Sequence, residues 1–270
     1  MRKLLLALLI VGSSVALGAD SKCPPTYASP FALADSGNCP PNYGYSGYLV
    51  PEQWQFVTNQ GWYCGTEKKQ SPIAVVPPFE PESQNPIKVA YKASLVTVMN
   101  SGHDIRVIPA LGNNTISTRE VPSASLDEFH FHVPNEHTIP GYAEKLAGEM
   151  HFVHTDPTNG NLYVIAQLLE ESPDDNRDLS PFLNPLPINL CGCQETKADL
   201  APLLPEQIPG YYRYVGSLTT PDCRGGVTFF VLPTTMKIGK NQLAALRHFG
   251  ENARPRQDLD GRPITRVTPE

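Results

Sequence analysis

The amino-acid sequence predicts a mainly β fold in a single domain, and three features of the chain support that prediction. Its 270 residues include 28 Pro and 20 Gly, spread along the chain, which indicates many turns. Short runs rich in β-branched and aromatic residues lie between these turn residues, as strands do. No linker divides the chain after its first residues, so we expect one domain.

The expected strands occupy the middle and the later part of the chain. They are the runs 87–91, 95–99, 105–108, 126–133, 150–154, 162–169, 211–214 and 227–232. One helix is expected over 240–249, because its apolar residues share one face and Gly250 follows as a stop signal. Residues 20–60 are rich in Pro, Gly, Tyr and Asn and are expected to be irregular, and segments 172–210 and 251–270 are expected to be surface coil.

Residues 1–19 have the pattern of a secretory signal peptide. Two basic residues precede an unbroken apolar run over 4–11, and small residues follow as far as Gly18 and Ala19. The apolar run is too short to span a membrane as a helix. We therefore expect an exported chain, periplasmic or secreted, without a membrane span.

Composition narrows the possible functions. Apolar residues make up 40% of the chain and charged residues 18%, so a packed core is expected. The formal net charge is −6 and no block of like charges occurs. The chain therefore lacks the basic footprint of a nucleic-acid-binding protein.

Six cysteines are present, and an even number in an exported chain favours disulfides over free thiols. They are Cys23, Cys39, Cys64, Cys191, Cys193 and Cys223. The pair at 191 and 193 could instead provide half of a soft metal site.

Histidines are concentrated in one short region, since five of the seven lie between residues 130 and 154. Phe129, His130, Phe131 and His132 alternate, so on a strand both imidazoles point to one face and both phenyl rings to the other. Two ligands cannot fill a tetrahedral site, and His151 on a neighbouring run is the candidate for a third. Three neutral imidazoles leave zinc one further position, as in catalytic sites.

Three carboxylates lie close to these histidines in the sequence. Glu128 and Glu149 each precede a candidate ligand by two residues and so face the same side, and Glu136 follows His132 by four. Ligand imidazoles usually donate their second N–H to a carboxylate or a carbonyl. An isolated His-x-His pair is more simply a solvated polar face, but a third His with three acids favours a metal site.

The same His-x-His pair, followed by Glu136, also resembles the opening of a cupin motif, which would bind iron or manganese. A cupin requires flanking glycines and a later Pro-x-Gly-x-x-His block. Neither occurs in this chain, so the cupin-type metal protein is the weaker alternative.

Several motifs in order resemble those of the alpha-class carbonic anhydrases, in the form that exported bacterial members have. They extend over about 42–262 and comprise the segments 42–47, 70–73, 129–137, 149–153, 217–221 and 252–262. The chain departs from the family pattern at several positions, which bear on rate and pH optimum more than on the reaction. These positions are Tyr43, Glu128, Val133, Asn135, Asp222 and Phe229.

The resemblance implies a central, mostly antiparallel twisted sheet of about ten strands with a few short peripheral helices. It implies a catalytic domain over 20–270, with an irregular cysteine-containing arm at 20–41, and reversible hydration of carbon dioxide to bicarbonate and a proton by zinc-bound hydroxide. The competing class is a catalytically weak or silent binding protein on the same fold. Such members lack one or more zinc histidines, and all three are present here. The sequence leaves open whether the chain forms a homodimer.

The resemblance also assigns roles around the metal. The implied zinc ligands are His130, His132 and His151. Each ligand has a supporting group: Glu128 for the first, the backbone carbonyl of Asn252 for the second and Glu149 for the third. Glu128 stands where Gln is common, and its carboxylate would make His130 a stronger donor.

Three further residues are implied to take part in the reaction. Thr219 would orient the nucleophile by donating its own hydroxyl proton to Glu136, and His103 would relay protons to buffer. Thr220 would line a polar wall. The implied carbon dioxide pocket consists of Val153, Val164, Leu218 and Phe229. The remaining histidines are expected to be structural or solvated: His137, His154 and His248.

The resemblance implies a disulfide between Cys64 and Cys223. The other four cysteines then allow three pairings. Cys191 and Cys193 would lie about 7 Å apart on an extended strand, which disfavours a direct bridge. We therefore favour bridges from Cys23 and Cys39 to this pair, with an intermolecular bridge as the alternative.

Overall fold

The computed structural model describes residues 21–22, 42–47, 49–57, 62–143 and 146–269. The expected signal peptide at 1–19 and the cysteines at 23 and 39 lie outside the described residues. Within them, no helix is both long enough and apolar enough to cross a membrane.

The described residues form one large twisted sheet, so the prediction of a mainly β fold is confirmed. It has 14 strands where about ten were expected, and its main path runs β1-β10-β4-β5-β7-β8-β9-β13-β12-β14-β2. In chain order the strands are β1 (Ser21–Lys22), β2 (Glu80–Ser83), β3 (Ile87–Ala90), β4 (Ser94–Asn100), β5 (Ile105–Pro109), β6 (Thr115–Ser117), β7 (Ala124–His132), β8 (Gly148–Thr155), β9 (Leu162–Ser172), β10 (Gly192–Ala198), β11 (Gln207–Ile208), β12 (Tyr211–Ser217), β13 (Gly225–Gly239) and β14 (Thr265–Thr268).

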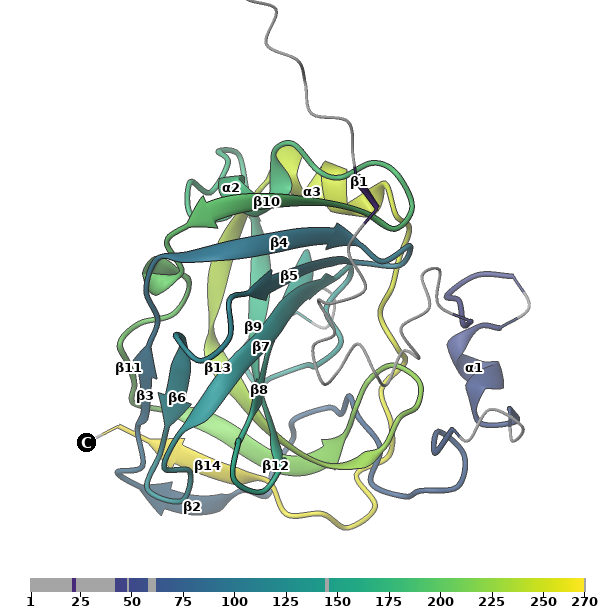
Figure 1. Cartoon of the computed structure of the whole chain (residues 1–270). Coiled ribbons are helices and arrows are strands. Elements are labelled where there is room, and N and C mark those ends of the chain that lie inside the picture. The colour runs from purple at the N-terminus through teal and green to yellow at the C-terminus, as the bar shows by residue number, and fades with distance from the viewer. Residues whose placement is uncertain (1–20, 23–41, 48, 58–61, 144–145, 270) are drawn as a thin grey trace, which may run out of the picture.

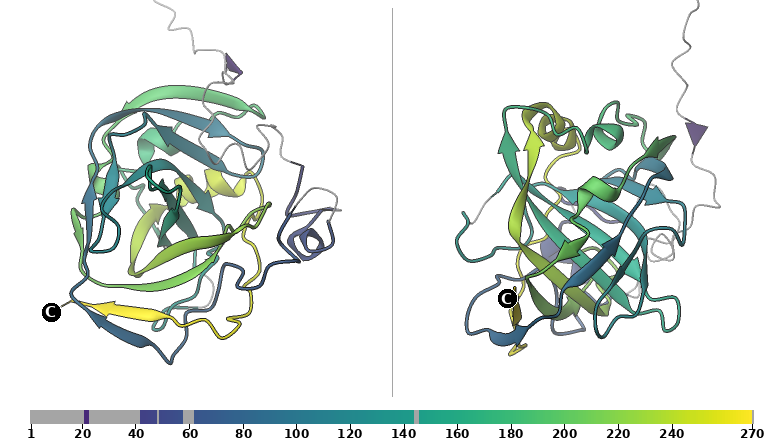
Figure 2. Two further views of the ribbon diagram at one scale, coloured as in Figure 1. Left: turned by 60° about the horizontal axis from the view of Figure 1, so that its bottom comes forward. Right: turned by 90° about the vertical axis from the view of Figure 1, so that its left-hand side faces the viewer.

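Antiparallel pairing dominates, as expected. Among the pairs of described strands only β13 with β9 and β14 with β2 are parallel. Among the described residues, three short α-helices accompany the sheet: α1 (Pro51–Trp54), α2 (Ser180–Leu183) and α3 (Lys240–Arg247). The sheet curves strongly, with α2 and α3 near one end and β14 and β2 near the other (Figures 1 and 2).

Strands β7, β8 and β9 lie at the centre of the sheet (Figure 1). The alternation predicted for β7 holds, because Phe129 and Phe131 are fully buried in the larger apolar core together with Phe152 of β8. Phe129 packs edge-on against Phe182 of α2, with ring centroids 5.1 Å apart. Burying these rings fixes which face of the central strands carries the histidines.

Two segments expected to be coil contain strands. Residues 172–210 include α2, β10 and β11, and residues 251–270 include β14. Strand β10 carries polar residues at most positions and pairs with β4. Backbone pairing with a neighbour, rather than an apolar pattern, makes it a strand. The expected helix at 240–249 is present as α3.

The predicted disulfide between Cys64 and Cys223 is confirmed, with 4.9 Å between the two Cα atoms. It packs with Tyr43, Trp54 and Trp62 in a small separate core. Cys191 and Cys193 are disulfide-bonded as well, which excludes the soft-metal alternative. Their favoured partners lie outside the described residues, so that pairing remains a prediction.

Candidate metal centre

The three candidate histidines meet on one face of β7 and β8. Antiparallel pairing sets His130 directly opposite His151, and His132 lies two residues further along β7. The ring centroids of the three imidazoles are 4.6 to 5.4 Å apart. Each ring offers one nitrogen, and these nitrogens all lie within 4.8 Å of one another. The side chains are buried, so the group is shielded from bulk water.

Acceptor groups on the far side of each ring determine which nitrogen carries a lone pair. Nδ1 of His132 lies 2.9 Å from the backbone carbonyl of Asn252, which can only accept, so this Nδ1 carries the proton. Nε2 of His151 lies 2.8 Å from a carboxylate oxygen of Glu149 and is the donor there. Nδ1 of His130 has no well-aligned hydrogen bond, but a carboxylate oxygen of Glu128 lies 3.3 Å from it and favours the proton on that side of the ring. The nitrogens left unprotonated in neutral rings are therefore the ones that converge.

Converging lone pairs repel one another unless a cation lies between them. Nε2 of His130 and Nε2 of His132 face each other at 3.1 Å. Two nitrogens of a tetrahedral zinc site are about 3.3 Å apart, given Zn–N bonds of about 2.05 Å. The donor set and its spacing therefore fit zinc, and three protein donors leave the fourth position to a ligand from solution.

Burial keeps two of these imidazoles neutral, as ligation requires. Desolvation, together with the neighbouring His130, lowers the pKa of His132 to about 4. Desolvation also lowers the pKa of His151 to about 4. Burial acts on His130 in the same direction, but the nearby carboxylate of Glu128 outweighs it and raises the pKa of this ring.

Glu149 is the most heavily hydrogen-bonded group at the centre. Its Oε2 accepts the backbone N–H groups of Glu136 at 2.8 Å and His137 at 2.7 Å, and its Oε1 also lies 2.6 Å from Nδ1 of His137. Burial opposes its ionisation, yet His137 and the hydrogen bonds hold its pKa well below the usual range. A permanent carboxylate at this position fixes the orientation of His151.

His137 continues this network away from the metal centre, in keeping with the structural role expected for it. Its Nε2 lies 2.6 Å from the hydroxyl of Tyr214, which in turn lies 2.9 Å from Oγ of Ser71. The sequence did not single out Tyr214 or Ser71, although Ser71 belongs to the motif at 70–73. Strand β12 brings Tyr214 to the site from 77 residues away.

Glu136 lies beside the ligand nitrogens. Its Oε2 is 3.5 Å from Nε2 of His132, and its Oε1 accepts the backbone N–H of Arg254 at 2.8 Å. Desolvation raises the pKa of this carboxyl group, while a hydrogen bond from the Thr219 side chain opposes the rise. The sequence placed Arg254 in the motif at 252–262 without giving it a role, and its buried guanidinium donates to Gln70 and to the carbonyl of Ser71.

The residues implied for the substrate pocket lie together in the smaller of the two sheet cores. Val153, Val164, Leu218 and Phe229 are all buried there. Phe229 lies beside the metal centre, with its ring centroid 5.7 Å from that of His151. Thr220 is half-buried. An apolar wall therefore adjoins the histidine cluster.

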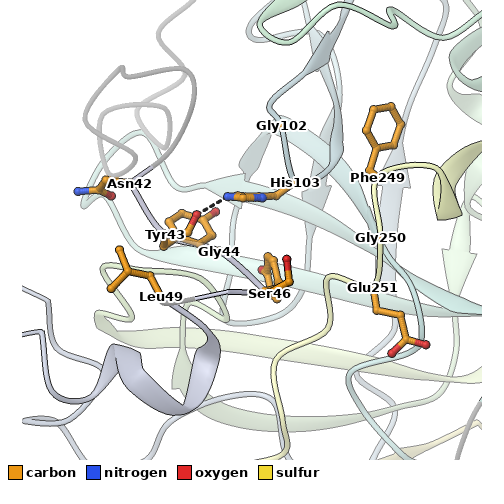
Figure 3. A pocket seen from close by; sticks show the side chains of 11 residues that line it. Asn42, Tyr43, Gly44, Ser46, Leu49, Gly102, His103, Phe249, Gly250 and Glu251 are labelled. Carbon is orange, nitrogen blue, oxygen red and sulfur yellow. Dashed lines mark hydrogen bonds between the residues drawn. The ribbon is translucent and has the colours of Figure 1, made fainter.

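His103 lies in the turn between β4 and β5, at a hollow of about 710 Å³ (Figure 3). Its Nε2 is hydrogen-bonded to the backbone carbonyl of Tyr43, and its ring packs against Tyr43 and Tyr45 with centroids 5.0 and 5.6 Å away. Asn252 connects this turn to the metal centre, since its Nδ2 donates to the carbonyl of His103 at 2.9 Å while its own carbonyl holds His132.

A buried three-histidine cluster with one position left to a solution ligand is the arrangement of a catalytic zinc enzyme. Comparison with known proteins specifies the family. The model of the family described as eukaryotic-type carbonic anhydrase matches residues 49–268. The chain belongs to this carbonic anhydrase family, which excludes the cupin-type alternative.

Individual relatives agree with this assignment. A carbonic anhydrase of Neisseria gonorrhoeae is 37% identical over 226 residues, covering 83% of this chain and 87% of the relative. A carbonic anhydrase of Pectobacterium atrosepticum is 32% identical over 228 residues, covering 83% and 90%. The solved alpha-carbonic anhydrase of Thermovibrio ammonificans, in complex with the inhibitor sulfanilamide, is 32% identical with a TM-score of 0.75, covering 85% and 100%.

Proposed function

We propose that the protein is a zinc-dependent carbonic anhydrase that reversibly hydrates carbon dioxide to bicarbonate and a proton. The observation that carries the proposal is the convergence of three imidazole lone pairs from His130, His132 and His151. Family membership supports the same reaction. A zinc ion bound there would act as a Lewis acid that makes hydroxide available at neutral pH, chemistry for which carbonic anhydrase is itself the standard example.

The chain's own residues position the reactants. Thr219 donates a hydrogen bond to Glu136, so its hydroxyl oxygen is left to accept one from the nucleophile and orient it. Glu136 keeps its place because its Oε1 accepts the backbone N–H of Arg254 at 2.8 Å. The apolar wall of Val153, Leu218 and Phe229 suits an uncharged linear substrate.

The reaction also produces a proton that must leave the site. His103 is proposed to pass it to buffer, since imidazole side chains serve as proton shuttles in proteins. Its position at the hollow, where it is accessible from solution, supports this role.

The protein is also proposed to act outside the cytoplasm, in the periplasm or the medium. The leader-like pattern at 1–19 supports export. The Cys64–Cys223 disulfide supports an oxidising compartment.

Stopped-flow measurement of carbon dioxide hydration, with a zinc assay on the same sample, tests the proposal. The wild-type protein should carry about one zinc per chain, and His132→Ala should lose both zinc and most activity. His248→Ala is the matched control, because it also removes a histidine but His248 is exposed to solvent at the end of α3. Full activity without zinc, or iron as the native metal, would contradict the zinc mechanism. Bound zinc without activity would favour the silent binding protein instead.

A further inference from the structure

Three buried charged side chains lie in a row behind the first candidate ligand. Asp104, Arg106 and Glu128 are 5%, 6% and 3% exposed. Nε of Arg106 lies 3.2 Å from Oδ1 of Asp104, and Nη1 of Arg106 lies 3.8 Å from Oε2 of Glu128. Oε1 of Glu128 lies 3.3 Å from Nδ1 of His130. The row therefore ends at Nδ1 of His130, on the edge of the imidazole ring away from the nitrogen that faces the metal position.

Burying a carboxylate at this position is costly unless it is paired. A neutral amide could accept the same N–H of His130 without that cost. Because Glu128 is present instead, its second oxygen requires a partner, and Arg106 is the cation nearest to it. Each oxygen of Glu128 thus faces a different group, and the contact with Arg106 restricts how the carboxylate can rotate.

Arg106 is itself fixed in place from two sides. On strand β5 its backbone pairs directly opposite His130 of β7. Its guanidinium is held by Asp104, whose carboxylate accepts a hydrogen bond from the hydroxyl of Ser101. The turn formed by residues 101–104 is also tied to the metal centre through the bond from Asn252 to the carbonyl of His103. The row is therefore anchored to backbone at its outer end.

We propose that Arg106, held by Asp104, is a positioning residue for zinc: it keeps the carboxylate of Glu128 against Nδ1 of His130 and thereby sets how long the centre retains the metal. This inference rests on the proposed function of the centre. The groups that orient ligand histidines typically change metal affinity by about 10–100-fold when they are replaced. Arg106 contacts Glu128 and not the ligand His130 itself, so we expect an effect at the lower end of that range.

The test is the rate of zinc release from the purified holoprotein into excess chelator, followed with a chromogenic zinc indicator. Arg106→Gln should release zinc about tenfold faster than wild type. Arg106→Lys keeps the charge but loses the planar fork, so it should fall between the two. Thermal unfolding of each variant establishes that it is folded, and Arg106→Lys is the fallback if Arg106→Gln does not fold.

Two further variants separate positioning from general stability. In a Glu128→Gln background, adding Arg106→Gln should change the release rate less than twofold, because the amide no longer depends on the cation. The control is Arg213→Gln, which removes another arginine from an ion pair, 2.7 Å from Glu82, and should leave zinc release unchanged.

The inference is wrong if folded Arg106→Gln releases zinc at the wild-type rate. It is also wrong if the substitution has an equal effect in the Glu128→Gln background, or if Arg213→Gln accelerates release as much. In each case the wild-type protein still binds zinc and hydrates carbon dioxide, so the proposed function stands. A wild-type protein that retains no zinc would overturn both.

Discussion

Lowering the pH should destabilise this protein through one buried histidine outside the metal centre. His154 is fully buried at the end of β8, where its Nε2 lies 2.6 Å from the hydroxyl of Tyr91 and its Nδ1 lies 3.2 Å from the carbonyl of Tyr163. Desolvation lowers its pKa from the usual 6.5 to about 3. The folded protein therefore holds this ring neutral throughout the physiological range.

The sign of the effect follows from proton binding. Below pH 6.5 the unfolded chain protonates His154 and the folded chain does not, so acid favours unfolding. The depressed folded pKa makes the full stability present above about pH 6.5 and reduces it as the pH falls. The linkage relation gives a loss of about 1.4 kcal/mol at pH 5.5 and about 2.7 kcal/mol at pH 4.5 relative to neutral pH.

Urea unfolding of wild type and His154→Gln at several pH values measures this loss. The variant should be less stable at pH 7.5 because it loses packing and a hydrogen bond. Its disadvantage should shrink by about 1.4 kcal/mol at pH 5.5, because it has no imidazole to protonate. His248→Gln, at an exposed position, should show no such change. A stability difference between wild type and His154→Gln that stays constant with pH would refute the reasoning.

Three further predictions follow from other parts of the molecule. Burial raises the pKa of Asp127 from its usual 3.8 to about 6, so its ionisation destabilises the folded state as the pH rises. Urea unfolding of Asp127→Asn should show a gain of at most about 3 kcal/mol at pH 7.5 and of only about 0.5 kcal/mol at pH 4. Replacing Cys64 and Cys223 together with Ala should cost as much as about 5 kcal/mol by the chain-entropy relation for residues 159 apart, and an unchanged thermal midpoint would contradict it. His103→Ala should lower kcat in dilute buffer, leave kcat/KM nearly unchanged and regain rate with imidazole buffer; wild-type rates in dilute buffer would end the relay role.

Local patterns in the sequence were sufficient for the central strands. The alternation of Phe and His over 129–132 requires only the two-residue repeat of a strand, and the buried phenyl rings then fix the orientation of the imidazoles. The same argument did not reach β10, whose polar sequence becomes a strand by pairing with β4. Strand identity there depends on a neighbour distant in the chain, which a local pattern cannot reveal.

Around the ligands, too, the sequence revealed the partners that are close in the chain and not those that are distant. Proximity in the sequence brought Glu128, Glu136 and Glu149 into consideration as partners of the histidines. The sequence alone could not show that the backbone N–H of Arg254 would bind Glu136, or that Tyr214 would contact His137 from 77 residues away. Such contacts depend on which strands become neighbours and in which register.

The sequence by itself therefore determined the class of fold, the three histidines and the face of the strand on which they lie, because these follow from side-chain alternation and residue chemistry. Only the tertiary structure decided which nitrogen of each ring faces the metal position, because distant carbonyl and carboxylate groups fix the proton on the other nitrogen. It also decided that Arg106 lies opposite His130, because strand register aligns residues that are far apart in the chain.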